Sequence, residues 1–375
     1  MIAAPSTPVP PAPTWSSVLG RLLSHEDLDG PTAGWAMNQI LSGEATPAQV
    51  AGFVTALRSK GETPTEVAAL VEVMLEHARL LDLGPGAPAV VLDVVGTGGD
   101  QLHTVNISTM AALVCAAAGA PIVKHGNRAA SSSTGTADVL EELGVAIDLD
   151  PAAVGQSVLT AGIGFCFAPT HHPAMRHAGP TRRELGVPTV FNILGPLTNP
   201  GLAGAALIGC ASATLAPVMA DVLCRRGVRA LVVRGDDGLD EISTLTTTQV
   251  WDATGDVVVE TSIDPTELGL RSVEPAALRG GDPARNALLL RKTLGIVDPA
   301  DIDAAQVAAI RDAVAINAAA ALVAFDAATG ADTADDSSLQ ERIARRLPDV
   351  GEVLDSGSAL VLLDRWIQVT QDLRA

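Results

Sequence analysis

Residues 89–95 read AVVLDVV, a nearly continuous apolar and β-branched run that only Asp93 interrupts. Such a run is typical of a strand that is buried on both faces of a parallel sheet. A glycine-rich turn follows at Gly96–Asp100, and a helical pattern then runs from Ile107 to Ala118. A strand, a glycine turn and a helix in this order predict an α/β layer structure, with its ligand at the carboxyl ends of the strands.

Strand and helix patterns alternate through the rest of the chain, which predicts a mostly parallel central sheet. A valine-rich hairpin is expected at Gln249–Glu260, turned at Thr254-Gly255. Further strands are expected at Ala120–Val123, Val145–Ile147, Gly164–Phe167, Ala205–Ile208 and Arg229–Arg234. Further helices are expected at Ala137–Leu143, Ala152–Leu159, Leu215–Arg226, Ala304–Ala328 and Leu360–Leu373.

The residues before this sheet predict a small all-helical domain, hinged to the large α/β domain. Thr46-Pro47-Ala48-Gln49 and Thr63-Pro64-Thr65-Glu66 are capping boxes with proline at the first helical position, and each opens an apolar-periodic segment. Trp15–His25 and Thr32–Leu41 are two more amphipathic stretches. The helical pattern breaks at Leu83–Gly86, where we expect a hinge or linker.

Two segments fit neither pattern. Pro169–Pro188 is polar, basic and interrupted by proline and glycine, so we expect it to leave the sheet, rejoin the helical domain and form one wall of a cleft. The first fourteen residues contain five prolines and resemble a disordered tail rather than a signal peptide. The expected division is a tail at 1–14, a helical domain at 15–84 plus about 169–188, and an α/β domain at 88–168 plus 189–375.

Length and composition agree with two domains and narrow the class of ligand. A chain of 375 residues exceeds the size at which one core keeps growing. A net charge of −19 disfavours binding to nucleic acid or to an anionic membrane, and it favours Mg²⁺ alongside any phosphate substrate. The four cysteines are far apart, so neither a zinc site nor a disulfide framework is indicated. We expect a soluble, cytoplasmic protein.

The loop Lys124–Asp138, KHGNRAASSSTGTAD, concentrates hydrogen-bond donors ahead of an expected helix. Main-chain N–H groups, hydroxyls and cations near a helix N-terminus make an anion site, because the helix end adds partial positive charge. A polar connection with a Ser/Thr cap would explain a generic serine-rich loop. The presence of Lys124, Asn127 and Arg128 in one short run favours a phosphate or pyrophosphate site.

Three other groups of residues are weaker signals when each is taken alone. The glycines of Gly96–Asp100 would let the backbone approach an oxyanion, although a tight turn explains them equally well. Asn106–Thr109 opens a helix, and Asn106 is a natural N-cap, whereas Ser108 could offer its oxygen to a metal or phosphate. Asp240-Glu241 offers hard oxygen ligands for Mg²⁺, against the background of an acidic chain.

The basic segment supplies candidate groups for an organic acid. A guanidinium of Arg182 or Arg183 could grip a carboxylate, although a solvated surface arginine is the equal alternative. His171, His172 and His177 lack acidic or cysteine partners nearby in the sequence, so we interpret them as structural rather than metal-binding. The spacing supports no Ser-His-Asp or Cys-His triad. Positioning and electrostatic catalysis on a phosphorylated substrate fit these pieces better than covalent catalysis.

Together the segments resemble the anthranilate phosphoribosyltransferase family in identity, order and spacing. The segments that carry the resemblance are GTGGD, NIST, KHGNRAASS, the run Thr181–Pro200 and DEIS at Asp240–Ser243. The resemblance implies the fold of the nucleoside-phosphorylase-like (class II) phosphoribosyltransferases, and homodimers formed through the small domain. It implies transfer of phosphoribosyl from phosphoribosyl pyrophosphate to the amine of anthranilate, releasing pyrophosphate, in tryptophan biosynthesis.

The resemblance also implies roles for individual residues. Lys124, Asp240 and Glu241 would be catalytic, and Ser108, Asp240 and Glu241 would hold two Mg²⁺ ions per subunit. The anthranilate side would comprise Gly96, Asn127, His172 and Arg182, with His125 beside the channel. Phosphoribosyl pyrophosphate would be bound by Gly96, Gly99, Asp100, Thr104, Asn106, Ile107, Ser108, Thr109, Lys124, His125, Gly126, Asn127, Arg128, Ala129, Ala130, Ser131, Ser132 and Thr136.

Two departures and two rival functions accompany this resemblance. Thr136 stands where many members carry serine, which keeps the hydroxyl, and Met175 stands where some relatives place an aromatic residue. A pyrimidine nucleoside phosphorylase of the same fold would need a base-binding pocket instead of this set of motifs. A non-catalytic, nucleic-acid-binding relative should have lost the glycine loop and gained positive charge, and this chain has done neither.

Overall fold

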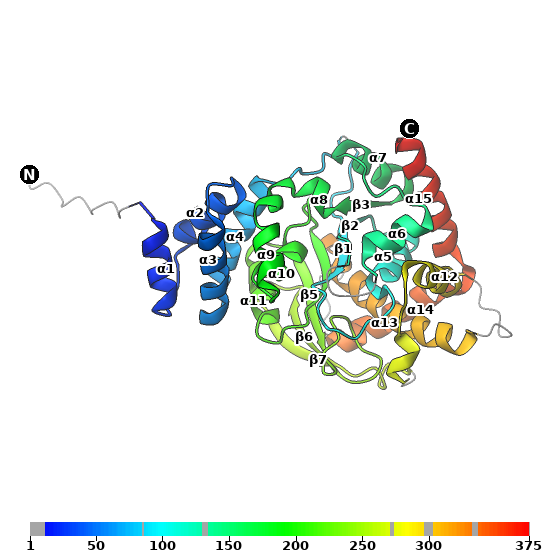
Figure 1. The fold of residues 1–375 in the computed structure, drawn as a ribbon. Coiled ribbons are helices and arrows are strands. Elements are labelled where there is room, and N and C mark those ends of the chain that lie inside the picture. Colours follow the sequence, from blue (N-terminus) through cyan, green and yellow to red (C-terminus); the bar gives the residue numbers. More distant parts are fainter. Residues whose placement is uncertain are drawn as a thin grey trace, which may run out of the picture.

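Four helices precede the first strand: α1 (Trp15–Leu23), α2 (Gly30–Leu41), α3 (Pro47–Lys60) and α4 (Pro64–Glu76). They belong to a computed structural model that describes residues 12–84, 86–129, 134–270, 274–295, 303–331 and 337–374, so residues 1–11 of the predicted tail lie outside it. Both predicted capping boxes are formed, at the starts of α3 and α4. Figure 1 shows the four helices in blue at one end of the molecule. The all-helical N-terminal domain is confirmed.

Seven strands form one sheet in the order β3-β2-β1-β4-β5-β6-β7. Neighbours from β3 to β5 pair in parallel, whereas β6 and β7 are antiparallel additions at one edge. The strands are β1 (Leu92–Gly96), β2 (Ile122–Gly126), β3 (Ile163–Phe167), β4 (Ala205–Gly209), β5 (Arg229–Gly235), β6 (Thr248–Ala253) and β7 (Val259–Ile263). The mostly parallel sheet and the predicted valine-rich hairpin, formed by β6 and β7, are therefore confirmed.

The strand predicted at Val145–Ile147 is wrong. Val145 and Ile147 are buried, as their apolar character suggested, but this segment does not pair with the sheet. The main-chain N–H of Ala146 instead donates to the Thr370 hydroxyl at 3.1 Å, which fastens the segment to the C-terminal helix. A short apolar run predicts that a segment is buried, but it does not show whether the buried segment pairs with a sheet.

Helices cover both faces of the sheet (Figure 1). The expected helices occur as α5 (Ile107–Ala117), α6 (Thr136–Leu143), α7 (Pro151–Ala161), α11 (Ala216–Arg225), α13 (Ala304–Thr329) and α15 (Ser358–Arg374). The sequence analysis missed α10 (Phe191–Leu197), α12 (Pro283–Leu294), α14 (Leu339–Ser356) and the short 3₁₀ turn η2 (Pro275–Leu278). Both α10 and α14 contain an internal proline, which is ordinarily a helix breaker.

Alternate residues of the strands feed two cores. Along β5, Leu231 and Val233 pack with α5 and α13, whereas Ala230 and Val232 face the opposite core with α11. Helix α13 is long and apolar enough to cross a membrane by length and composition alone. However, 78% of its most apolar window is buried inside the fold, which is what a core helix requires.

The basic segment after β3 packs against two of the N-terminal helices. It forms α8 (Ala168–His171), the 3₁₀ turn η1 (Pro173–His177) and α9 (Gly179–Leu185). Helix α9 packs on α3, and η1 packs on α2. The main-chain N–H of Arg79 donates to the His171 carbonyl at 2.7 Å, so the segment that follows α4 is bonded to the segment that follows β3.

Candidate active site

Glycines end four of the five parallel strands, and their lack of a side chain lets loops approach the carboxyl edge of the sheet. A Cβ atom on Gly209 would lie 1.5 Å from the main-chain oxygen of Asp240, and one on Gly96 would lie 2.4 Å from its carboxylate. Asp240 can therefore cross the ends of β1 and β4 only because both positions are glycine. Its carboxylate accepts a hydrogen bond from the Gly98 main-chain N–H at 2.6 Å.

Three loops from distant parts of the sequence meet at this edge. Glu241 Oε1 accepts from the main-chain N–H of Ser108, in the first turn of α5, at 3.1 Å. The Ser108 hydroxyl lies 3.4 Å from Nζ of Lys124, the central residue of β2. The structure thus brings together Ser108, Lys124, Asp240 and Glu241, which lie in three separate segments of the sequence.

Lys124 is almost completely buried, with 1% of its surface exposed. Its Nζ donates to the Val94 carbonyl at 2.5 Å, and the carboxylates of Asp93 and Glu241 lie nearby. Burial lowers the pKa of the Lys124 ammonium, whereas these two carboxylates raise it and so favour the charged form. The lysine is therefore held at the floor of the site by groups from β1 and from the loop after β5.

Asp93 is a member of the site that the sequence analysis noted only as a break in an apolar strand. Burial raises its pKa to about 6, and the charge of Lys124 opposes that rise. Its carboxylate accepts from the His125 main-chain N–H at 3.3 Å and from Asn199 Nδ2 at 2.7 Å. An aspartate in a strand that is buried on both faces needs such partners. Its presence in the apolar run 89–95 was therefore the sequence signal that Asp93 belongs to a polar site.

The paired acids are suited to a divalent cation. Burial raises the pKa of Glu241 to about 7 and that of Asp240 well above its ordinary value, and the charge of Asp100 adds to both shifts. Crowded carboxylates are hard oxygen ligands, and Mg²⁺ typically takes one or two of them together with water and phosphate oxygens. Within the described ranges, no group of three or more His, Cys, Asp or Glu side chains could hold a metal alone. The donor set therefore fits Mg²⁺ that shares its shell with a phosphorylated ligand.

A buried amide supports the acidic loop from the opposite side. Asn317, on α13, accepts from the Ile242 main-chain N–H at 2.9 Å and donates to the Ile242 carbonyl at 3.0 Å. Ile242 directly follows Glu241, so this pair of bonds fixes where the two carboxylates stand. Asn317 was not predicted as a site residue, because its only local signal is an asparagine in an alanine-rich helix.

The loop between β2 and α6 is closed at its base (the neck), where Ala129 and Gly135 come together. The main-chain N–H groups of Ala129 and Gly135 both donate to Asp138 Oδ2 at 2.9 Å. A Cβ atom on Gly135 would lie 2.3 Å from the Ala129 nitrogen, so the neck requires glycine there. The candidate residues Ala130, Ser131 and Ser132 lie outside the described residues.

Arg128 and Asn127 are exposed at this neck. The Arg128 guanidinium pairs with Asp138 at 3.0 Å and with Glu141 at 2.8 Å, and it lies over the Phe167 ring. These carboxylates raise the pKa of Arg128 above its ordinary value. The cation that the sequence analysis assigned to a phosphate is thus committed to helix α6. Asn127 Oδ1 accepts a hydrogen bond from the main-chain N–H of Arg128. The Nδ2 group of Asn127 takes no part in that bond.

The remaining candidates for binding phosphoribosyl pyrophosphate differ in which of their groups a ligand could contact. Ile107 and Thr109 are buried in the core, so only their main-chain groups are available to a ligand. Asn106 occupies the N-cap position of α5 but makes no side-chain cap bond, contrary to the interpretation of Asn106 as a simple cap. Gly99 is exposed, whereas Asp100, Thr104, Gly126 and Thr136 are partly buried around the same edge.

Arg182 and two histidines line the side toward the helical domain. The Arg182 guanidinium lies 5.2 Å from the centre of the Phe191 ring, and no carboxylate pairs with it in the part of the chain that the structure describes. Burial lowers its pKa. The His125 and His172 rings lie 5.1 Å apart, and each bonds a main-chain carbonyl through one nitrogen. The other ring nitrogen of each is buried and has no hydrogen-bond partner among the residues that the structure describes.

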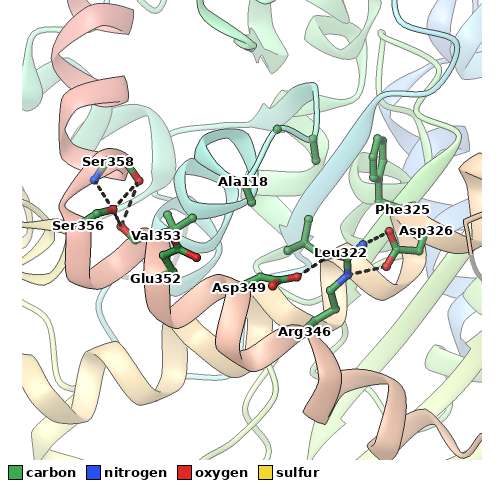
Figure 2. A pocket seen from close by; sticks show the side chains of 12 residues that line it. Ala118, Leu322, Phe325, Asp326, Arg346, Asp349, Glu352, Val353, Ser356 and Ser358 are labelled. Carbon is green, nitrogen blue, oxygen red and sulfur yellow. Dashed lines mark hydrogen bonds and ion pairs between the residues drawn. The ribbon is translucent and has the colours of Figure 1, made fainter.

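A separate cavity of about 420 Å³ lies among α5, α13 and α14. Figure 2 shows Arg346 in it, paired with Asp326 and Asp349. Ala118–Ala120 line it from the end of α5 opposite Ser108. This cavity shares no residue with the carboxyl edge of the sheet, and its cation is already paired.

The two buried histidines should make the fold less stable in acid. Burial lowers the pKa of His125 to about 3 and that of His172 to about 4, below the 6.5 of an exposed imidazole. The unfolded chain binds these protons first, so the free energy of unfolding falls as the pH drops below 6.5. Each histidine should lower the free energy of unfolding by about 2 kcal/mol between pH 7 and pH 5.

Urea denaturation of the wild type and of His172→Gln at both pH values measures this loss. The variant should lose about 2 kcal/mol less than the wild type between pH 7 and pH 5. An identical loss in the two proteins would mean that His172 does not titrate below its ordinary range.

Comparisons with known proteins agree with this geometry. The model described as "Glycosyl transferase family, helical bundle domain" matches residues 16–78, and "Glycosyl transferase family, a/b domain" matches residues 88–360. Anthranilate phosphoribosyltransferase of Saccharopolyspora erythraea is 51% identical over 362 residues, covering 96% of this chain and 97% of the relative.

Solved structures show the same relationship. The anthranilate phosphoribosyltransferase of Thermus thermophilus is 40% identical, with a TM-score of 0.82, over 96% of this chain and 99% of that one. The enzyme of Saccharomyces cerevisiae, solved in complex with PRPP and Mg, is 29% identical with a TM-score of 0.81, over 96% and 98% of the two chains. The chain belongs to the anthranilate phosphoribosyltransferase family.

Proposed function

We propose that this chain transfers the phosphoribosyl group of 5-phosphoribosyl 1-pyrophosphate (PRPP) to the amine of anthranilate, giving N-(5-phosphoribosyl)anthranilate and pyrophosphate in tryptophan biosynthesis. The observation that carries the proposal is the meeting of Lys124, Ser108 and the pair Asp240-Glu241 at one edge of the sheet. The Saccharomyces cerevisiae relative has been solved in one structure with PRPP and Mg and in another with 4-fluoroanthranilate. The phosphorylase and nucleic-acid-binding alternatives receive no support from these relatives.

The acidic side of the site supports Mg²⁺ as the cofactor. Asp240, Glu241 and the Ser108 hydroxyl would hold it, with two ions per subunit as our finer proposal. When bound there, Mg²⁺ would supply positive charge for the pyrophosphate leaving group. The chain's own contribution is to hold the carboxylates in place through Asn317 and the Gly98 N–H before any ligand arrives.

Lys124 and the neighbouring main-chain donors would hold the phosphate groups of the donor. The Lys124 ammonium stands at the floor of the site, where it can donate to a departing pyrophosphate oxygen in place of the Ser108 hydroxyl. Gly96, Gly99, Asp100, Thr104, the first turn of α5 and the described part of the 124–136 loop complete the proposed donor site. Arg128 would have to leave Asp138 and Glu141 to join them.

The side toward the helical domain would bind anthranilate. Arg182 offers a half-buried guanidinium without an acid partner among the described residues, which suits a carboxylate. Gly96 and Asn127 would border the same pocket, and the neutral rings of His125 and His172 would line its approach. An aromatic amine is neutral at pH 7, so the nucleophile needs no strong base.

Water must be kept from the electron-poor ribose during the transfer. Closure of the helical domain toward the α/β domain would exclude it, with Gly84 and Gly86, both at positive φ, in the connecting segment. The domain limits, 15–84 plus about 169–188 and 88–168 plus 189–375, belong to this proposal. So do a homodimer formed through the helical domain and a cytoplasmic location.

The fluorescence of anthranilate tests the function directly. Enzyme, PRPP and anthranilate should show a loss of anthranilate emission that requires Mg²⁺ and that is matched mole for mole by released pyrophosphate. No loss at high enzyme concentration, together with phosphorolysis of uridine or thymidine, would instead assign the chain to the phosphorylases.

Arg182→Ala should chiefly weaken the use of anthranilate. Losing a charged hydrogen-bonding group should raise the anthranilate KM by about tenfold or more, with the PRPP KM within about twofold. Arg183→Ala is the matched control, because Arg183 is an exposed neighbour on the same helix. A rise confined to the PRPP KM would show that the role given to Arg182 is wrong.

A further inference from the structure

A segment far along the chain reaches back to the donor side of the site. Residues 278–280 run beside the loop that follows β1: the Val105 N–H donates to the Leu278 carbonyl, and the Gly280 N–H donates to the His103 carbonyl, each at 2.9 Å. Thr104 and Arg279 form the antiparallel bridge between them. Helix α12 then starts at Pro283, with Asp282 as its N-cap. Residues 278–286 belong to none of the motifs that carry the proposed function.

Asn286, in the first turns of α12, is the centre of this contact. It is 2% exposed, and both ends of its carboxamide are used. Its Oδ1 accepts from the Gly281 N–H at 2.7 Å, and its Nδ2 donates to Asn106 Oδ1 at 3.0 Å. The amide orientation is therefore fixed by the Gly281 N–H, which can only donate and so requires the Asn286 oxygen on its side.

The bonds from Asn286 continue into a closed ring. Because Asn106 Oδ1 is an acceptor for Asn286, its Nδ2 is left to donate, and it donates to the Thr134 carbonyl at 3.3 Å. The Thr134 hydroxyl donates to the Gly281 carbonyl at 2.8 Å, which completes the ring. The ring joins the start of α5 to the end of the 124–135 loop, the two segments expected to hold the donor's phosphates.

The ring also explains why Asn106 is not a cap. A capping asparagine uses its Oδ1 to accept from the N–H of the second or third helical residue. Here Asn286 occupies that oxygen, and α5 has no side-chain cap bond from its N-cap residue. The Ser108 N–H consequently meets Glu241 instead. The first three N–H groups of α5 donate to the Val105 carbonyl, to Glu241 Oε1 and to the Asn106 carbonyl, with no side chain of the N-cap residue among their acceptors. The end of α5 therefore faces the centre of the site, where the partial positive charge of a helix N-terminus stabilises an anion.

We propose that Asn286 is a positioning residue that sets the affinity for the phosphoribosyl donor, by holding Asn106 off the end of α5 and by fixing the Thr134 end of the neighbouring loop. This inference rests on the proposed function for the identity of the donor. Asn286 acts through Asn106 and Thr134 and does not touch the substrate itself.

Asn286→Leu tests the proposal, because leucine keeps the approximate volume and removes both hydrogen bonds. We expect the PRPP KM to rise about tenfold, with kcat within about threefold and the anthranilate KM within about twofold. The dissociation constant of PRPP, measured by calorimetry in the presence of Mg²⁺, should rise by the same factor. Thr134→Val cuts the same ring at another bond and should weaken PRPP binding severalfold, so the test does not depend on one variant folding.

A double-mutant cycle decides whether the effect passes through Asn106. If it does, Asn106→Ala combined with Asn286→Leu should bind PRPP no more weakly than the worse single variant, within about twofold. Ser157→Ala is the control for lost stability, because Ser157 makes buried hydrogen bonds to Ile163 and Trp366 and lies in α7, outside the site. It should lower the melting temperature and leave both KM values unchanged.

Two results would overturn the inference: PRPP binding by Asn286→Leu and Thr134→Val equal to that of the wild type, or losses that multiply in the double variant. A wild-type chain that binds PRPP but does not consume anthranilate would overturn the proposed function alone. The calorimetric comparison of the variants would still report on Asn286 in that case.

Discussion

The burial of one ammonium group constrains the whole site. Lys124 is sealed beneath the carboxyl edge of the sheet, and an unpaired charge there would cost several kcal/mol. Asp93 and Glu241 offset that cost only while both stay close, so β1, β2 and the loop after β5 must keep a fixed geometry. Glu241 in turn meets the first turn of α5. The requirement that the Lys124 charge be compensated thus fixes the relative positions of elements that are more than a hundred residues apart.

Neutral carboxamides complete this arrangement without adding charge. Asn199 bonds Asp93 and the Val123 carbonyl, and Asn317 holds the backbone beside Glu241. Asn286 does the same for the start of α5. Each amide has both a donor and an acceptor, so it can satisfy main-chain groups that strand and helix ends leave open. In a site already crowded with carboxylates, this support leaves the balance between Lys124 and its acidic partners undisturbed.

The sequence predicted what is local and missed what is assembled across the chain. The β1 run and the capping boxes of α3 and α4 carry their structural meaning within a few residues, so they could be predicted directly. Asp93, Asn286 and Asn317 have meaning only through partners 30 to 180 residues away. For Arg128 the local sequence indicates a phosphate ligand but does not show that helix α6 supplies two carboxylates to the same guanidinium.

The most direct test of the central role of Lys124 is a calorimetric titration of PRPP, with Mg²⁺ present, into the wild type and into Lys124→Met. Methionine keeps an unbranched apolar stem and removes the charge. The account predicts that binding weakens by about thirtyfold or more, because a buried charged donor is lost from beneath the phosphates. A folded Lys124→Met protein that binds PRPP as tightly as the wild type would contradict it, and the buried lysine would then be only a structural counter-charge for Asp93 and Glu241.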